Sequence, residues 1–65
     1  MANNLKKIRE AQGLSQSELS KRSGVSRPTI IKIETEDEPN VKAKTLVALA
    51  DALGCSVTEI FFASV

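Results

Sequence analysis

The side chains of this sequence that could bind a ligand are mainly lysines and arginines, and they are concentrated in its first half. Residues 1–33 contain seven basic and two acidic side chains, whereas residues 34–65 contain two basic and six acidic ones. The basic residues of the first half are Lys6, Lys7, Arg9, Lys21, Arg22, Arg27 and Lys32. Because the net charge of the chain is only +1, this asymmetry indicates one face directed at an anion. A mixed, solvated surface is the alternative that charge alone leaves open.

The residue types that dominate enzyme and metal sites are nearly absent. The chain has no histidine and one cysteine, Cys55, which excludes the usual zinc clusters and an internal disulfide. Only scattered carboxylates, which no apolar pocket surrounds, could act as acid–base catalysts. We therefore expect that the protein is not an enzyme and binds no metal and no cofactor. We interpret Cys55 as a small buried hydrophobic residue rather than a redox sensor.

Neither a membrane nor export is indicated by the sequence. No apolar run approaches 18 residues, and the N-terminus lacks the pattern of a signal peptide. The lack of a disulfide framework fits a reducing cytosol. We therefore expect a cytoplasmic protein that does not bind a membrane.

The spacing of apolar residues predicts one all-helical domain over residues 1–65. Apolar residues recur at intervals of three and four, as in amphipathic helices, and no longer run alternates with the period of two that strands show. We expect helices over about residues 4–12, 15–23 and 43–53, a further helix from about residue 26, and a fifth from residue 56. A polar loop, ETEDEPN, precedes the fourth helix, and its Pro39 excludes helix there.

Local capping signals support these boundaries. Ser15 with Glu18, and Ser56 with Glu59, each have the spacing of a capping box. The three glycines each follow a predicted helix, where a left-handed residue would end it: Gly13, Gly24 and Gly54. Agreement between capping and periodicity indicates a unique helical fold.

The stretch LSQSELSKRSGVSRPTIIKIE, residues 14–34, has the pattern of a helix, a short glycine-containing turn and a second helix. We expect Val25 to be buried in the turn, and Leu19, Ile30 and Ile33 to fix the angle between the helices. The stretch resembles the Cro and phage-repressor (XRE-like) family, and TLVALADALGCSVTEIF resembles that family's fourth and fifth helices. The resemblance covers about residues 5–61 and implies a five-helix lambda-repressor-like DNA-binding domain.

The resemblance also implies that the third helix lies in the major groove and contacts bases from its first turn and from one turn later. These positions hold Arg27, Pro28 and Lys32, flanked by Thr29 and Ile31. Arg27 could bond in bidentate fashion to guanine O6 and N7, whereas Lys32 could read a guanine or hold a phosphate. Ile31 faces away from the predicted core, so it is either incidental or a contact to a thymine methyl.

Pro28 departs from the polar residue that is common at its place in the family. Proline fits the first turn of a helix, because its missing N–H is no loss there. It also disfavours a helical conformation at Arg27, so the N-cap is either Ser26 or Arg27. Against a base, Pro28 can offer only apolar contact.

Five residues are candidates for contacts with DNA phosphates. In the family, the residue at Gln16 contacts a phosphate, and the exposed N–H groups at a helix N-terminus favour such an anion; a solvent-facing side chain is the alternative. Ser15 could serve both as a cap and as a ligand, and Arg9 could also reach a phosphate. Lys42 replaces the usual Ser or Thr cap of the fourth helix and leaves it poorly capped. With Lys44, it could hold the DNA backbone or reach the adjacent minor groove.

Arg9 and Glu34 match a family ion pair that ties the first helix to the end of the third. Beyond that pair the sequence departs from the family, which usually has Asn-Gly or Arg-Gly after the third helix. Here Thr35 is followed by three acidic residues, 36–38, which argue against the family's backbone contacts from this loop. The loop is either a solvated segment or a docking site for a basic protein partner.

An apolar tail, IFFASV, predicts a homodimer. Phe62 cannot share the inward face with Phe61, and Val65 ends the tail, so both are candidates for the dimer interface; the alternative is that Phe62 folds back over the first helix. The resulting hypothesis is a transcriptional regulator, a repressor that binds double-stranded DNA as a dimer at a pseudo-palindromic operator. The competing hypothesis is a protein-interaction module, antitoxin-like or antirepressor-binding, on the same fold.

Overall fold

The computed structural model describes residues 3–36 and 40–62, and every regular element in these ranges is helical. Four α-helices are followed by one short π-helix: α1 (Leu5–Ala11), α2 (Gln16–Ser23), α3 (Arg27–Thr35), α4 (Ala43–Leu53) and η1 (Thr58–Phe62). This architecture confirms the prediction of an all-α, five-helix domain. Within the described ranges, no helix has the length and apolar character needed to cross a membrane.

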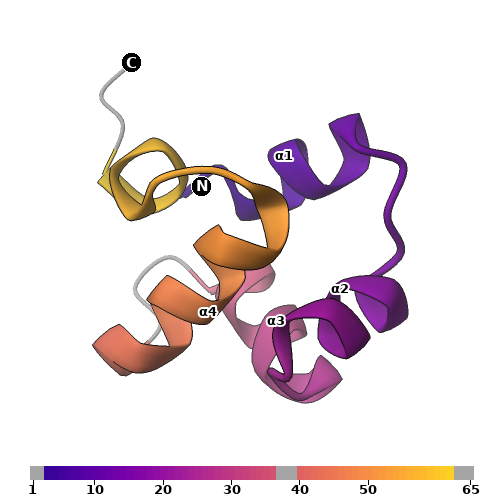
Figure 1. The fold of residues 1–65 in the computed structure, drawn as a ribbon. Coiled ribbons are helices and arrows are strands. Elements are labelled where there is room, and N and C mark those ends of the chain that lie inside the picture. Colours follow the sequence, from indigo (N-terminus) through magenta and orange to yellow (C-terminus); the bar gives the residue numbers. More distant parts are fainter. Residues whose placement is uncertain (1–2, 37–39, 63–65) are drawn as a thin grey trace.

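The core receives at least one fully buried side chain from each of the five elements. In Figure 1, α1 lies above α2 and α3, and α4 and η1 lie on the left of the view. The side chains without exposed surface are Leu5, Leu19, Ile30, Ile33, Leu49 and Ile60, and they include the three residues predicted to pack the second helix against the third. Full burial of such a side chain contributes about 1.5–3 kcal/mol, so each element is held to the others mainly by this cluster.

The predicted helix ends are confirmed at α2. The Ser15 hydroxyl accepts a hydrogen bond from the Glu18 N–H at 3.0 Å, and the Glu18 carboxylate accepts one from the Ser15 N–H at 2.9 Å. The helix ends at Gly24, whose φ of 75° lies in the left-handed region that favours glycine. These two local signals fix where the turn toward α3 begins.

The beginning of α3 is settled at Ser26. This residue has extended backbone angles, φ −62° and ψ 147°, and its hydroxyl lies 3.4 Å from the Thr29 backbone nitrogen and 2.8 Å from the Thr29 hydroxyl. Arg27 is therefore the first helical residue, and Pro28 occupies the first turn. At the start of α4, Lys42 is the N-cap and makes no capping hydrogen bond, as predicted.

The fifth element differs from the ordinary helix that the sequence predicted, because it is a five-residue π-helix. Its capping box is present, with Ser56 and Glu59 exchanging hydrogen bonds of 3.0 and 3.1 Å. The carbonyls of Glu59 and Ile60 accept hydrogen bonds from Asn4, through its side chain at 3.3 Å and its backbone N–H at 2.8 Å. A turn this short gains its stability from such outside contacts, which the sequence pattern of the element itself does not contain.

Three further predictions concern the C-terminal tail, the acidic loop after α3 and Cys55. Val65 and acidic residues 37–38 lie outside the described residues, whereas Glu36 is exposed at the end of α3. Cys55 is half-buried against the core, with its sulfur 3.5 Å from the Leu53 carbonyl oxygen. It therefore packs as a small hydrophobic residue with one exposed side.

Candidate DNA interface

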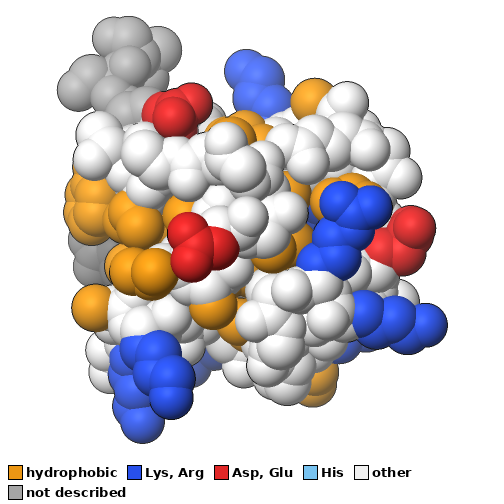
Figure 2. Space-filling model, viewed as in Figure 1, with side chains coloured by type: hydrophobic (Ala, Val, Ile, Leu, Met, Phe, Trp, Pro, Cys, Tyr) orange, Lys and Arg blue, Asp and Glu red, His pale blue; other side chains and the backbone are white. Residues whose placement is uncertain are grey.

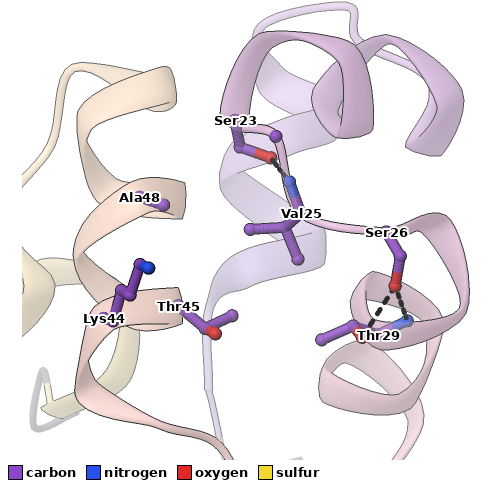
Figure 3. A pocket seen from close by; sticks show the side chains of 8 residues that line it. Ser23, Val25, Ser26, Thr29, Lys44, Thr45 and Ala48 are labelled. Carbon is purple, nitrogen blue, oxygen red and sulfur yellow. Dashed lines mark hydrogen bonds between the residues drawn. The ribbon is translucent and has the colours of Figure 1, made fainter.

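The turn between α2 and α3 is held by serines of α2. The Ser20 hydroxyl donates to the Val25 carbonyl at 2.6 Å, and the Ser23 hydroxyl accepts from the Val25 N–H at 3.1 Å while donating to the Leu19 carbonyl. Figure 3 shows the Ser23–Val25 bond and the Ser26–Thr29 cap on the two sides of the turn. Both backbone polar groups of Val25 are thus satisfied, and the Val25 side chain packs against the core, although it is half-buried rather than buried as expected. These bonds fix the direction in which α3 leaves the turn.

Arg9 of α1 and Glu34 of α3 form a buried, bidentate ion pair. Arg9 Nε lies 2.8 Å from Glu34 Oε2, and Arg9 Nη2 lies 3.1 Å from Glu34 Oε1; their side chains are only 9% and 2% exposed. Arg9 Nη1 also donates to the Leu14 carbonyl at 2.7 Å, and the Gln16 amide donates to Glu34 Oε1 at 3.1 Å. The network joins α1, the loop before α2, the first residue of α2 and the end of α3. It therefore fixes the N-terminus of α2 relative to α3.

The electrostatics of Arg9 are those of a structural cation. The hydrogen bond to Glu34 raises the pKa of the Arg9 guanidinium above its ordinary value, and burial opposes that rise only in part. All three guanidinium nitrogens donate to acceptors inside the domain. We therefore correct the expectation that Arg9 also reaches a phosphate, because burial and these bonds reserve it for the ion pair.

Gln16 belongs to this network, and Ser15 precedes it in the chain at the N-terminus of α2. Gln16 is half-buried and uses its amide nitrogen toward Glu34, so the network orients its side chain at the N-terminus of α2. Ser15 is exposed, and its hydroxyl oxygen caps the helix. A bound phosphate would meet the free N–H groups of the first turn here.

The outward face of α3 carries the residues singled out as base readers. Arg27, Pro28, Ile31 and Lys32 are exposed, with Ile31 at 38%, whereas Thr29 is half-buried and its hydroxyl is bonded to Ser26. Arg27 and Lys32 are therefore the long polar side chains that this face presents. Among the described residues, neither one forms an ion pair.

Two shallow hollows lie between α3 and the beginning of α4. One, of about 290 Å³, is bounded by the turn at residues 23–26 and by Lys44 and Ala48 of α4 (Figure 3). The other, of about 300 Å³, is bounded by Lys32 and by residues 40–42. Thr29 and Thr45 line both hollows. Lys42 and Lys44 are exposed beside them, so these two cations lie next to the outward face of α3.

A separate apolar surface lies over the last elements. Figure 2 shows hydrophobic side chains gathered on the left of the molecule, over α4 and η1, and basic side chains at the lower left, over the beginning of α4. The largest exposed hydrophobic residues of this part of the chain are Phe62, at 67%, and Val47, at 49%. Phe62 therefore does not fold back over α1.

Sequence reasoning missed two side-chain amides, the buried Asn3 and the more exposed Gln12, that bond to helix ends. The Asn3 side chain donates to the Ile33 carbonyl at 3.0 Å and accepts from the Leu5 N–H at 2.9 Å. One side chain thus satisfies a carbonyl in the last turn of α3 and the first N–H of α1. The Gln12 amide donates to the Leu53 carbonyl at 2.8 Å, at the end of α4. An asparagine before a predicted helix was a capping signal, but its second partner lies 30 residues away and left no trace in the local pattern.

Comparison with known proteins agrees with this geometry. A family model described as helix-turn-helix matches residues 5–60, which include all of α1 to α4. The chain belongs to the XRE-like helix-turn-helix family. It is also 38% identical over 60 residues to control protein C.SmaI from Serratia marcescens, covering 92% of this chain and 70% of that protein. As a member of the XRE-like family, the chain is a non-enzymatic, DNA-binding transcriptional regulator.

Proposed function

We propose that this XRE-like regulator is a repressor that binds a pseudo-palindromic operator as a homodimer, with α3 in the major groove. The observation that carries the proposal is the contrast between the two faces of α3. Its inner face is fixed by Ile30, Ile33 and the Glu34 network, whereas its outer face presents Arg27 and Lys32 to solvent. A helix whose inner face is fixed and whose outer face presents exposed cations is suited to reading base edges, because the helix itself needs no rearrangement before contact.

The phosphate contacts are proposed on both sides of α3. On one side, Gln16 and Ser15 lie at the N-terminus of α2, where backbone N–H groups and the helix dipole favour an anion. On the other side, Lys42 and Lys44 border the hollows at the beginning of α4. Contacts on both flanks of a recognition helix fix its register on the duplex.

The base contacts are proposed for the exposed residues of α3. Arg27 would fork onto a guanine, and Lys32 would contact a base or a phosphate one turn later. Ile31 and Pro28 would contribute apolar contact, most usefully to a thymine methyl, and Thr29 would support them from its bond to Ser26. Repression would follow sterically, because a dimer on an operator that overlaps a promoter blocks polymerase.

The dimer is proposed through η1, because Phe62 is the most exposed large hydrophobic residue in the described part of the chain. Small domains commonly gain stability by such association. Sedimentation is expected to show a dimer that Phe62→Ser weakens and that Lys21→Ala, an exposed substitution on α2, leaves unchanged. A monomer at high micromolar concentration, with and without DNA, would count against the dimer.

Selection from random duplexes tests the whole proposal. We expect enrichment of two related half-sites in inverted orientation, with centres about 10 bp apart. An in vitro transcription reaction with the selected site across a promoter should then lose transcript as protein is added. If no sequence is enriched even at low salt, the alternative of a protein-interaction module gains the stronger case. A regulator of this kind acts where the DNA lies, and we propose the cytoplasm as its location.

A further inference from the structure

Two neighbouring asparagines before α1 are hydrogen-bonded to two different elements, the last turn of α3 and η1. Asn3 donates through its side chain to the Ile33 carbonyl in α3, at 3.0 Å. Asn4 donates to η1, through its backbone N–H to the Ile60 carbonyl at 2.8 Å and through its side chain to the Glu59 carbonyl at 3.3 Å. Because the two residues are adjacent in the chain, their hydrogen bonds form a short bridge between the last turn of α3 and η1.

The chemistry of these contacts makes the bridge specific. The last carbonyls of a helix have no partner within it, so they need donors from elsewhere. Ile33 lies in the last turn of α3, and Asn3, which is only 9% exposed, supplies its donor in the protein interior. A buried carbonyl that loses a hydrogen-bond donor is costly, so the side chain of Asn3 is held in one position. Its oxygen is used as well, because it accepts the N–H of Leu5.

The two ends of the bridge carry the two proposed contacts of the regulator. α3 presents Arg27 and Lys32, and η1 ends at Phe62. We infer that Asn3 and Asn4 are positioning residues that set the orientation of η1 relative to α3, and thereby the half-site spacing that the dimer accepts. This inference rests on the proposed dimer, since a monomer has no spacing to set.

The bridge acts on geometry rather than on affinity for a single half-site. In a dimer held through η1, the separation of the two α3 helices depends on the orientation of each α3 relative to its own η1, which the core packing and the asparagine bridge set together. The apolar cluster still holds α3 and η1 when Asn3 is replaced, but it lacks the direction of a hydrogen bond, so we expect small changes in their relative orientation that make operators of neighbouring spacings acceptable. The contacts of Arg27 and Lys32 within one half-site do not pass through Asn3.

The test compares binding to operators that differ only in spacing. Wild type and variants of the full chain would be titrated against duplexes with two selected half-sites, whose centres are separated by about 8 to 13 bp. Asn3→Ser is the main variant, because its hydroxyl can still accept the Leu5 N–H but is too short to reach Ile33. Asn3→Asp is the second variant, because it keeps the acceptor oxygen and removes the donor, so a folding failure of one variant leaves the other to be measured.

Gln12→Ala is the matched control. It removes an amide that donates from the end of α1 to a helix-end carbonyl, Leu53, at 2.8 Å, but this bond leads to α4 and not to η1. It should therefore leave the spacing profile unchanged, and it should lower thermal stability less than the Asn3 variants do, because Gln12 is exposed and makes a single side-chain bond. In the Asn3 variants, the ratio of the affinity for the best spacing to the affinity for neighbouring spacings should fall about tenfold. Affinity for a single half-site should change by about twofold or less.

The outcomes separate this inference from the proposed function. If wild type shows no spacing preference, the dimer proposal fails and the inference fails with it. If wild type shows a preference that both Asn3 variants retain, the inference alone is overturned. A loss of preference in Gln12→Ala equal to that in the Asn3 variants would also overturn it, because the effect would then be one of general stability.

Discussion

Arg9 and Arg27 are the same residue type in two opposite environments. Arg9 lies under the helix-turn-helix unit with its guanidinium bonded to Glu34 and to the Leu14 carbonyl, whereas Arg27 stands exposed at the first turn of α3. The difference shows that a cluster of cations in a sequence is not one site. Burial and pairing make one arginine part of the scaffold, and exposure leaves the other able to bind.

The largest expected effect tests the buried side of this comparison. Arg9→Ala leaves the Glu34 charge buried without its partner, so the free energy of unfolding should fall by about 3–5 kcal/mol. In a domain of this size, each kcal/mol lowers Tm by about 4–8 °C, so thermal or denaturant unfolding will report the change. Arg22→Ala, at an exposed position, should remain within about 0.5 kcal/mol of wild type. Equal stability of the two variants would show that the ion pair contributes nothing measurable.

The exposed side of the comparison predicts a loss of binding without loss of stability. Arg27→Ala should cost about 1–3 kcal/mol on the selected operator and relax the preference at one base position in each half-site. Arg27→Lys should restore the charge but little of the bidentate geometry. Binding-site selection with wild type and both variants measures this. If all three return one consensus, Arg27 contacts phosphate, and the base reader must be sought at Lys32 or Thr29.

Lys44 sharpens the comparison, because it is exposed like Arg27 but is assigned to the backbone. Lys44→Ala should weaken binding to every duplex alike and lower the slope of log K against log salt by about one unit. Gel shifts at several salt concentrations, on selected and scrambled duplexes, provide the measurement. Lys6→Ala on α1 serves as the charge-matched control. A change in sequence preference in Lys44→Ala would place it among the base readers.

The smallest effect concerns an exposed acid, Glu18, in contrast to the buried Glu34. The hydrogen bond from the Ser15 N–H lowers the pKa of the Glu18 carboxyl in the folded protein. A carboxyl whose folded pKa lies below its unfolded value stabilises the protein above the unfolded pKa, about 4.3, and loses this contribution as pH falls through the folded pKa. The stability difference between wild type and Glu18→Gln should therefore be present near neutral pH and vanish in acid. A pH-independent difference for Glu18→Gln would contradict the assignment.

What the sequence predicted well was local. The capping boxes at Ser15 and Ser56 and the left-handed Gly24 depend on residues within four positions of each other, so their signals are visible in the chain. The inward faces followed from periodicity, and the Arg9–Glu34 pair was inferred from the family resemblance alone. The sequence did not show whether Arg9 was also available to DNA, because that depends on the burial of its side chain.

What the sequence could not predict depends on contacts between distant segments. The donor of Asn3 meets an acceptor 30 residues away, and that of Gln12 meets one 41 residues away. An isolated Asn or Gln has many possible partners, and only the packing of the helices selects one. The attachment of η1 belongs to the same class, because Asn4, at the other end of the described chain, supplies donors to two of its carbonyls.

The bonds from Asn4 to η1 also have a consequence for biosynthesis. Asn4 leaves the ribosome long before its acceptor Glu59, which follows 55 positions later. At the usual speed of translation, about 5–20 residues per second, that interval lasts roughly 3 to 11 seconds, whereas isolated helices form within about a microsecond. The recognition helix α3 is therefore synthesised several seconds before η1, which completes the core that holds α3. We expect a nascent chain released before Ile60 to be a protease-sensitive fragment, so that only chains translated past this point add to the pool of active regulator.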